Sequence, residues 1–291
     1  MAGETLTTGL PGIVQSIRAR SYSLIAKTGV MKSLVTPLSG TGNSFVEPYF
    51  DPTQTPGTTT ALQTVAEGTD ITALSSVTAT RRTYTATEYQ LMSFMTDKSR
   101  EQSLESVKQF HAEMHGYQHA ANLETRLLGT FASATYSITA TSSTGLTWAK
   151  VAAARALLEK QTLSAPKPYS LVISPEQFYH FAAAMTGNAN YGPVGTLADK
   201  IQQEYAVASL VGGVNVFQTS YFTASSGYQT AGMFAKPAIG LFIPNGSDYS
   251  IESQRDASKR GDELVSTFNF GARIRIPGYA VAVKAKSTTP A

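Results

Sequence analysis

Residues 96–131 read TDKSREQSLESVKQFHAEMHGYQHAANLETRLLGTF, the longest stretch of helical pattern in the chain. Thr96 or Asp97 can cap such a helix, and Ser99 with Gln102 has the spacing of a capping box. Gly129 is placed to end it. At 1.5 Å per residue, a helix from Asp97 to Phe131 would be about 50 Å long, which is longer than most compact domains use. We therefore expect a structural spine.

Apolar residues of this segment recur at three- and seven-residue intervals, and this spacing predicts the face that is turned to the core. The predicted core face consists of Leu104, Val107, Met114, Ala121 and Leu128, with Phe110, Tyr117 and Leu127 beside it.

Three of the four histidines, His111, His115 and His119, follow one another at four-residue spacing on the same helix. Two imidazoles at i and i+4 can chelate zinc from one helix face. However, His111-Ala112-Glu113-Met114-His115 has its glutamate in the wrong place for the zinc-protease pattern, and one further histidine, His180, remains to complete a site. The three are weak metal candidates. A solvated or interface-packed row on an exposed face is the expected role, and a pH-sensitive subunit contact is a third reading.

The ribbon before the helix, Asp51 to Thr80, contains no aromatic residue, lysine or arginine. It cannot build a core alone, so it is either a disordered linker or a two-stranded arm that is buried against another chain. Strand character from Arg81 to Met95, where Tyr84, Ala86, Met92 and Phe94 share one parity, favours the arm. The expected subunit-contact residues of this arm are Thr58, Thr59, Leu62, Val65 and Ile71.

The segment from Leu6 to Val46 holds basic residues and no acidic one. Its apolar clusters predict a short amphipathic helix flanked by an extended arm. Its positive charge could face a polyanion or simply be solvated. The candidate DNA-facing residues are Arg18, Arg20, Lys27 and Lys32.

After the long helix, residues 140–235 alternate between helix and strand, and the remainder is β. Tyr169–Ile173 is a buried type of strand, and Ser174-Pro175-Glu176-Gln177 begins a helix. A further helix is expected near Leu197–Tyr205. In the strand Phe268–Ile276, apolar and polar residues alternate. Residues 254–263 are expected to form a mixed-charge loop that either pairs with symmetry mates or is a solvated hairpin tip. Its contact candidates are Arg255, Asp256, Lys259, Arg260, Asp262 and Glu263.

Composition points away from catalysis. Charged residues make up 15% of the 291, against about 25% in an average domain, and the net charge of +3 is too weak to indicate a nucleic-acid reader. The chain has no cysteine, and no phosphate-loop, nucleophile-elbow or dinucleotide-binding glycine motif. No signal peptide or membrane-spanning run is expected either. These features favour a non-enzymatic protein without cofactors that is made in a cytoplasm. A surface with so few charges suits a protein that is covered by neighbouring subunits. The alternative is a β-rich extracellular domain, which has a similar composition.

The order of elements resembles the major capsid protein of tailed bacteriophages, a fold that encapsulins share. The resemblance rests on the passage Thr83–Leu128, on Met233-Phe234-Ala235-Lys236-Pro237-Ala238-Ile239-Gly240, on Tyr249-Ser250-Ile251-Glu252-Ser253 and on Phe270-Gly271-Ala272-Arg273-Ile274. It implies an α+β fold with five parts: an N-terminal arm (1–45), an extended β-loop (46–82), peripheral strands and spine helix (83–139), an α/β axial domain (140–235), and returning strands (236–291).

The resemblance also implies a function. The chain would assemble with itself into pentamers and hexamers of an icosahedral shell around double-stranded DNA. Portal, scaffolding or decoration proteins would be its further partners, and the virion, assembled in the host cytoplasm, its location. An encapsulin-like nanocompartment is the alternative, and a zinc enzyme built on the histidine row a more distant one.

Overall fold

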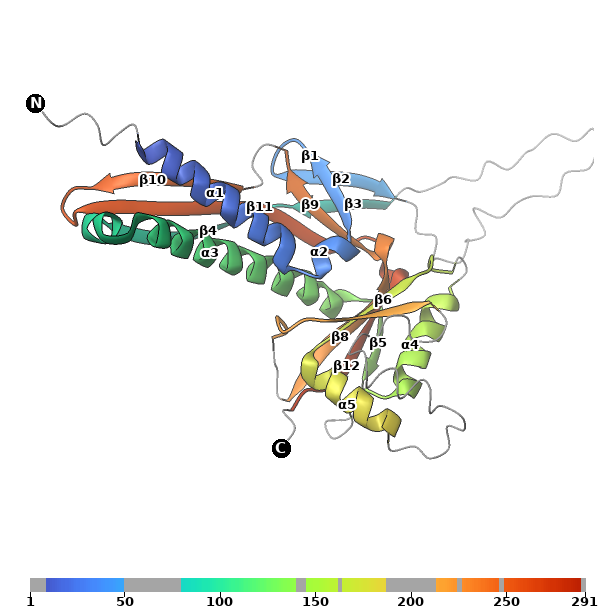
Figure 1. The fold of residues 1–291 in the computed structure, drawn as a ribbon. Coiled ribbons are helices and arrows are strands. Elements are labelled where there is room, and N and C mark those ends of the chain that lie inside the picture. Colours follow the sequence, from blue (N-terminus) through green and yellow to red (C-terminus); the bar gives the residue numbers. More distant parts are fainter. Residues whose placement is uncertain are drawn as a thin grey trace, which may run out of the picture.

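The computed structural model describes residues 9–49, 80–139, 145–161, 164–186, 213–223, 227–245 and 249–288. They form two five-stranded sheets, a two-stranded ribbon and helices packed against them. In Figure 1 an elongated part carries α3 beside β10 and β11, and a second part groups β5, β6, β8 and β12 with α4 and α5. One cluster of buried apolar side chains runs through both parts. The α+β class expected from the sequence is confirmed.

The N-terminal segment is a helix, α1 (Gly9–Thr28), followed by the single turn α2 (Met31–Leu34). Helix α1 lies against α3. At their contact a Cβ on Gly116 would come within 2.9 Å of the Leu24 Cβ, so glycine permits the close approach. The Ser21 hydroxyl donates to the Ala112 carbonyl at 2.9 Å. The expected short helix is thus 20 residues long and packed on α3, and the N-terminal arm stays a prediction.

The spine helix is α3, Asp97–Gly129, and its 33 residues correspond to about 50 Å. The Thr96 hydroxyl accepts a hydrogen bond from the Ser99 backbone N–H at 3.1 Å, so Thr96 is the N-cap. The alternative of a Ser99–Gln102 capping box is therefore wrong, because Ser99 is already inside the first turn. The α-helix ends at Gly129, as predicted, and is followed by the 3-10 turn η1 (Thr130–Ser133).

The buried face of α3 is not the predicted one. Phe110 and Tyr117 are 63% and 47% exposed, whereas His111, His115 and His119 are buried. Between the histidines lie Ala112, Gly116 and Ala120, whose small side chains let α1 and the sheet approach the helix. Leu127 and Leu128 are buried as expected, and the Leu104 side chain lies outside the described residues.

The first sheet has the order β1-β9-β11-β10, and β4 also pairs with β11. Strand β11 is its longest member. Its residues 261–270 pair with β4, and residues 271–274 pair with β9. At the change of partner a Cβ on Gly271 would lie 2.4 Å from the Thr85 carbonyl oxygen, which only glycine avoids. The strands are β1 (Thr36–Gly40), β4 (Thr87–Thr96), β9 (Ile239–Pro244), β10 (Tyr249–Asp256) and β11 (Gly261–Ile274).

A two-stranded antiparallel ribbon, β2 (Ser44–Tyr49) and β3 (Thr80–Thr85), leads into β4 through Ala86. Tyr84 and Ala86 pack on Phe242 of the first sheet. Beyond Ala86 the parity changes: Met92 is 61% exposed and Met95 is buried. The expectation of one shared face from Tyr84 to Phe94 is wrong because the chain passes from one ladder to another at Ala86.

The second sheet has the order β5-β12-β8-β6-β7. Ser174 and Gln177 form the predicted capping box, with reciprocal hydrogen bonds of 3.2 Å, and helix α5 begins at Pro175. The helix expected near 197–205 lies outside the described residues. The elements are β5 (Tyr136–Thr139), α4 (Trp148–Glu159), β6 (Tyr169–Ile173), α5 (Pro175–Thr186), β7 (Val214–Gln218), β8 (Tyr228–Ala235) and β12 (Ala280–Lys286), with short 3-10 turns η2 (Lys236–Ala238) and η3 (Pro277–Tyr279). No helix among the described residues is long and apolar enough to cross a bilayer.

Candidate functional site: the spine helix and its two polar networks

The predicted mixed-charge loop is mostly strand. Strands β10 and β11 pair through Asp256↔Gly261, so the turn is only residues 257–260. The prediction of a ten-residue loop at residues 254–263 is therefore wrong, because strand pairing continues through the charged residues at both of its ends. The alternation predicted farther along β11 is confirmed, with Phe268, Phe270 and Ile274 buried.

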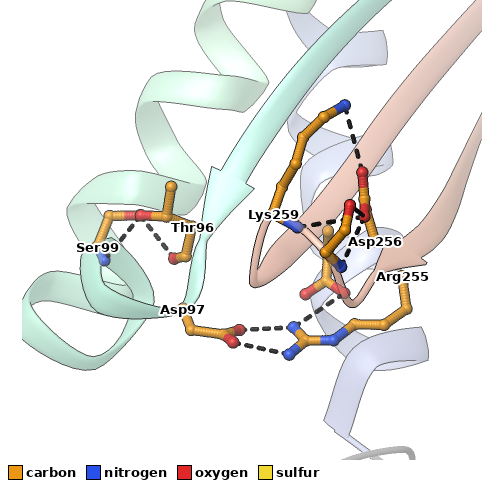
Figure 2. A network of polar contacts seen from close by, with 8 residues as sticks. Thr96, Asp97, Ser99, Arg255, Asp256 and Lys259 are labelled. Atoms are coloured by element: carbon orange, nitrogen blue, oxygen red, sulfur yellow. Dashed lines mark hydrogen bonds and ion pairs between the residues drawn. The ribbon is translucent and has the colours of Figure 1, made fainter.

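Charges at this hairpin tip are paired within the chain (Figure 2). The Arg255 guanidinium donates to both Asp97 carboxylate oxygens, at 2.6 and 2.7 Å, and lies 3.6 Å from Asp262. These two hydrogen bonds raise the pKa of Arg255. Because Asp97 is the first residue of α3, the pair ties the hairpin to the start of the spine helix. The Asp97 backbone N–H also donates to the Arg260 carbonyl at 3.0 Å.

Lys259 and Asp256 form the other half of the network. Lys259 Nζ lies 3.2 Å from Asp256 and 3.0 Å from Glu263. Asp256 also accepts from the Ser258 hydroxyl and backbone N–H, at 2.6 and 2.9 Å, and these bonds lower its pKa to about 2. Five of the six predicted contact residues are thus engaged internally. Arg260 forms no ion pair with a described residue, and its φ of +48° is unusual for a side chain larger than glycine.

The second network is the histidine row, which is buried between α3 and strands β4 and β11. The Ser93 hydroxyl lies 2.9 Å from His111 Nδ1 and 2.7 Å from His115 Nε2. The Ser266 hydroxyl lies 2.5 Å from His115 Nδ1 and 2.7 Å from His119 Nε2. Imidazoles and hydroxyls therefore alternate in one chain of five groups. The expectation of an exposed histidine face is wrong.

Burial keeps these imidazoles neutral. It lowers the pKa of His115 and His119 to about 4, with neighbouring histidines adding to the effect at His115, and it also lowers the pKa of His111. A serine hydroxyl stands between each pair of rings, where a metal ion would need the ring nitrogens to converge. No group of three His, Asp or Glu side chains among the described residues could hold a metal ion. The geometry suits core packing with satisfied polar groups.

Three basic residues of α1 and α2 have partners within the chain. Arg18 donates to the Tyr249 carbonyl at 2.8 Å, and Arg20 pairs with Glu113 of α3 at 3.0 Å. Lys32 lies over the Tyr22 ring, 5.7 Å from its centroid, and the Lys27 side chain lies outside the described residues. Binding of DNA by these residues stays a prediction.

The arm residues Thr58, Thr59, Leu62, Val65 and Ile71 also lie outside the described residues. Strands β2 and β3, which flank them, pair in an antiparallel ladder that reaches Tyr49↔Thr80. The chain therefore leaves the ladder at Tyr49 and re-enters it directly opposite, at Thr80.

Sequence reasoning missed the partners in both networks. Ser93 and Ser266 carry no motif, and Asp97 was noted only as a possible helix cap. A signal for the histidine row did exist: Ala112, Gly116 and Ala120 beside the histidines mark a face of small residues, which close helix packing requires. Glu124 was noted only as a carboxylate near the histidines, and its role was missed. It is buried, and its carboxylate accepts from the Val30 and Met31 backbone N–H groups at 3.1–3.2 Å, which fixes the α1–α2 turn to α3.

No protein-family sequence profile matches the chain, and no curated protein shows a significant sequence match. Solved structures do match. A chain from Mycobacterium phage Che8 aligns with a TM-score of 0.60 at 14% identity, covering 88% of this chain and 90% of that one. The capsid of cyanophage P-SCSP1u aligns with a TM-score of 0.60 at 17% identity, covering 89% of each chain. This is the tailed-phage capsid fold.

Encapsulins share it: the holo-SrpI encapsulin complex of Synechococcus elongatus aligns with a TM-score of 0.59 at 9% identity, covering 90% of this chain and 89% of that one. The capsid fold predicted from element order is therefore confirmed over nearly the whole chain. Within that fold, both networks hold α3 in place. The hairpin tip binds its N-terminal end, and the histidine row joins its buried face to β4 and β11.

Proposed function

We propose that the chain is a structural shell subunit, not an enzyme, and that it assembles with itself into pentamers and hexamers of an icosahedral phage capsid around double-stranded DNA. The observation that carries the proposal is the alignment with phage capsids over about nine-tenths of both chains. In this proposal residues 46–82 extend over a neighbouring copy, residues 1–45 run along the shell, and residues 140–235 surround its fivefold and quasi-sixfold axes.

The thinly charged composition supports the proposal. A subunit that is covered on several sides by copies of itself needs few surface charges, and a closed shell multiplies many modest interfaces. Portal, scaffolding or decoration proteins would be additional partners, and the virion, assembled in the host cytoplasm, the location.

An encapsulin-like compartment is the second candidate, because the alignment with the Synechococcus encapsulin is as good as those with phages. The two candidates differ in what the shell encloses. A zinc enzyme is not proposed, since serine hydroxyls separate the three imidazoles.

The test is to express the chain alone and examine the product by sedimentation and electron microscopy. We expect closed particles. A chain that stays monomeric at high concentration and neutral pH contradicts the proposal. If particles form, nuclease-protected DNA in particles made during infection supports the capsid, and a co-purifying cargo protein with no DNA supports the compartment.

A further inference from the structure

The β2–β3 ribbon is joined to the rest of the subunit by two short connections (Figure 1). Residues 41–43 lead from β1 into β2, and Ala86 leads from β3 into β4. The Ala86 backbone N–H donates to the Asn43 carbonyl at 2.8 Å, so the two connections lie side by side. A ribbon that is attached at one end through two adjacent connections can rotate about them, unless contacts farther along the ribbon hold it against the sheet.

The first of these contacts is apolar and lies close to the connections. Phe45 and Tyr84 are partners in the β2–β3 ladder, and both pack on Phe242 of β9. The Phe45 and Phe242 ring centroids are 5.7 Å apart, and Tyr84 is buried. Hydrophobic contacts are not directional, so this one holds the ribbon to the sheet without specifying its angle.

The second contact is polar and lies farther along the ribbon. Glu47 is about 10 Å beyond Ser44, the first residue of β2, at ~3.3 Å per residue. Its carboxylate accepts hydrogen bonds from Arg275 Nε, at 2.8 and 3.0 Å, and from Arg275 Nη2. The Tyr84 hydroxyl donates to the same carboxylate at 3.4 Å. Burial, together with the charge of Glu47, raises the pKa of Tyr84 to about 12, so the phenol keeps its proton and remains a donor.

The Glu47–Arg275 pair is partly shielded from water. The Glu47 side chain is 13% exposed and the Arg275 side chain 28%, so salt screens this pair less than it screens a fully exposed one. A bidentate arginine–carboxylate pair requires two parallel hydrogen bonds, so it specifies an orientation as well as a distance.

Arg275 is itself held in place. It directly follows β11, and its backbone N–H donates to the Ala238 carbonyl at 2.7 Å. Two residues earlier, Arg273 Nη1 donates to the Thr83 carbonyl at 3.1 Å. The end of β11 therefore binds both strands of the ribbon, β2 through Glu47 and β3 through Thr83.

These contacts all lie on one face of the ribbon. Phe45 and Glu47 share that face because side chains alternate along a strand, and Val46, on the other face, is 49% exposed. The angle between ribbon and sheet therefore depends on the inner face, where the Glu47–Arg275 pair is the directional side-chain contact farthest from the connections.

We propose that the Glu47–Arg275 pair is a positioning contact that sets the angle at which the β2–β3 ribbon leaves the sheet, and that subunits need this angle to close into a shell. The inference rests on the proposed shell function, in which residues 46–82 extend over a neighbouring copy. A ribbon whose direction is fixed before assembly loses less conformational entropy when subunits join. Breaking the pair should therefore impair assembly more than folding.

The test measures the direction of the ribbon in the full-length chain. The chain has no cysteine, so Val46→Cys and Met92→Cys, at positions that are 49% and 61% exposed, provide two unique sites for spin labels. Pulsed electron paramagnetic resonance then gives the distribution of distances between the ribbon and β4. We expect this distribution to become at least twofold broader with Glu47→Gln, which removes the charge and one acceptor. Exchanging the two charges, by Glu47→Arg with Arg275→Glu, should narrow it again.

Asp97→Asn is the matched control, because it breaks a second bidentate pair, with Arg255, at the other end of β4. It should leave the distances unchanged. Circular dichroism melting checks the fold, and Arg275→Lys, which keeps the charge but not the parallel bonds, replaces Glu47→Gln if that variant does not fold. An unchanged width when the pair is broken, no narrowing on charge exchange, or equal broadening by Asp97→Asn overturns the inference.

Electron microscopy of the same variants without labels tests the link to assembly. Glu47→Gln should lower the yield of closed particles at least threefold, and the charge exchange should restore it. A normal yield from Glu47→Gln despite broadened distances overturns that link. If the wild type forms no particles, the shell proposal fails separately, and the distances still decide whether the pair sets the angle of the ribbon.

Discussion

The hairpin tip and the histidine row hold the same helix by opposite physical means. At the tip, full charges pair in water, where screening and side-chain entropy leave each exposed pair little net free energy. In the row, neutral rings and hydroxyls are cut off from water, so each hydrogen bond is modest, but leaving one unmade costs the desolvation of a buried group. The histidine row should therefore contribute more to stability than the hairpin tip. Four measurements test this ranking.

The largest effect should come from acid. His115 and His119 have a pKa of about 4 in the folded chain against 6.5 for an ordinary histidine. Their contribution is complete above pH 6.5 and is lost as the pH falls toward 4, because the unfolded chain binds protons that the folded core resists. At ~1.4 kcal/mol per pKa unit the loss is on the order of several kcal/mol. Urea unfolding between pH 7.5 and 4 measures it; a flat profile contradicts the buried, neutral row.

Other titrating groups near the row must be separated from it. Burial raises the pKa of Glu124, so this carboxyl favours the folded state as the pH falls, opposite to the histidines. Glu124→Gln removes that opposing contribution, and the acid loss should then become steeper. On α1, Arg18 contacts the Tyr249 carbonyl and Arg20 pairs with Glu113.

The next largest effect should follow Ser266→Ala. This change removes the hydroxyl shared by His115 and His119 and leaves two buried ring nitrogens without a partner. We expect a loss of about 1–3 kcal/mol in the free energy of unfolding at pH 7.5. Ser258→Ala, at the exposed turn, is the matched control and should cost much less. Equal losses for the two variants would mean that burial does not distinguish the networks.

A smaller effect is expected for Asp97→Asn, which breaks the bidentate pair with Arg255. The loss should be less than half that of Ser266→Ala and should shrink as sodium chloride is raised toward about 1 M, because salt screens exposed charges. Thermal melting at low and high salt checks both statements. A loss that is large and independent of salt would show that the tip behaves as a buried network.

The smallest effect should come from Arg260→Gly, and its sign should be reversed. The φ of +48° is strained for arginine and unstrained for glycine. We expect the isolated subunit to be unchanged or more stable by up to about 1 kcal/mol. Urea unfolding of the unassembled chain measures this. A clear destabilisation would mean that the Arg260 side chain makes a contact that its backbone position does not suggest.

The sequence was sufficient for the fold because long elements carry redundant signals. The spine helix has a threonine cap, a terminal glycine and 33 residues with helical periodicity. Misjudging any one residue would therefore not have changed the prediction of a helix. The buried face was misjudged because apolar spacing favoured Phe110 and Tyr117, whereas small residues decided what α1 could pack against. The parity error at Met92 arose because the exchange of ladder partners at Ala86 is a tertiary event without a local motif.

The polar sites were less predictable for a related reason. Asp97 and Arg255 are 158 residues apart, and Ser93 and Ser266 meet the histidines only after β4 and β11 have paired. From residue type alone, the histidines were predicted to be candidate metal ligands, and the charged residues of the hairpin tip to be candidate subunit contacts. Their roles depend on which neighbours the topology supplies, which one sequence does not contain.

The place of β12 has a consequence for synthesis. It lies between β5 and β8, and β5 pairs with no other strand in the described sheet. While residues 280–286 are still inside the ribosome, β5 and β8 each lack the neighbour that completes their hydrogen bonding. The second sheet can therefore close only after β12 has left the ribosome, so a growing subunit with an open sheet edge is exposed to premature contacts until that strand is released.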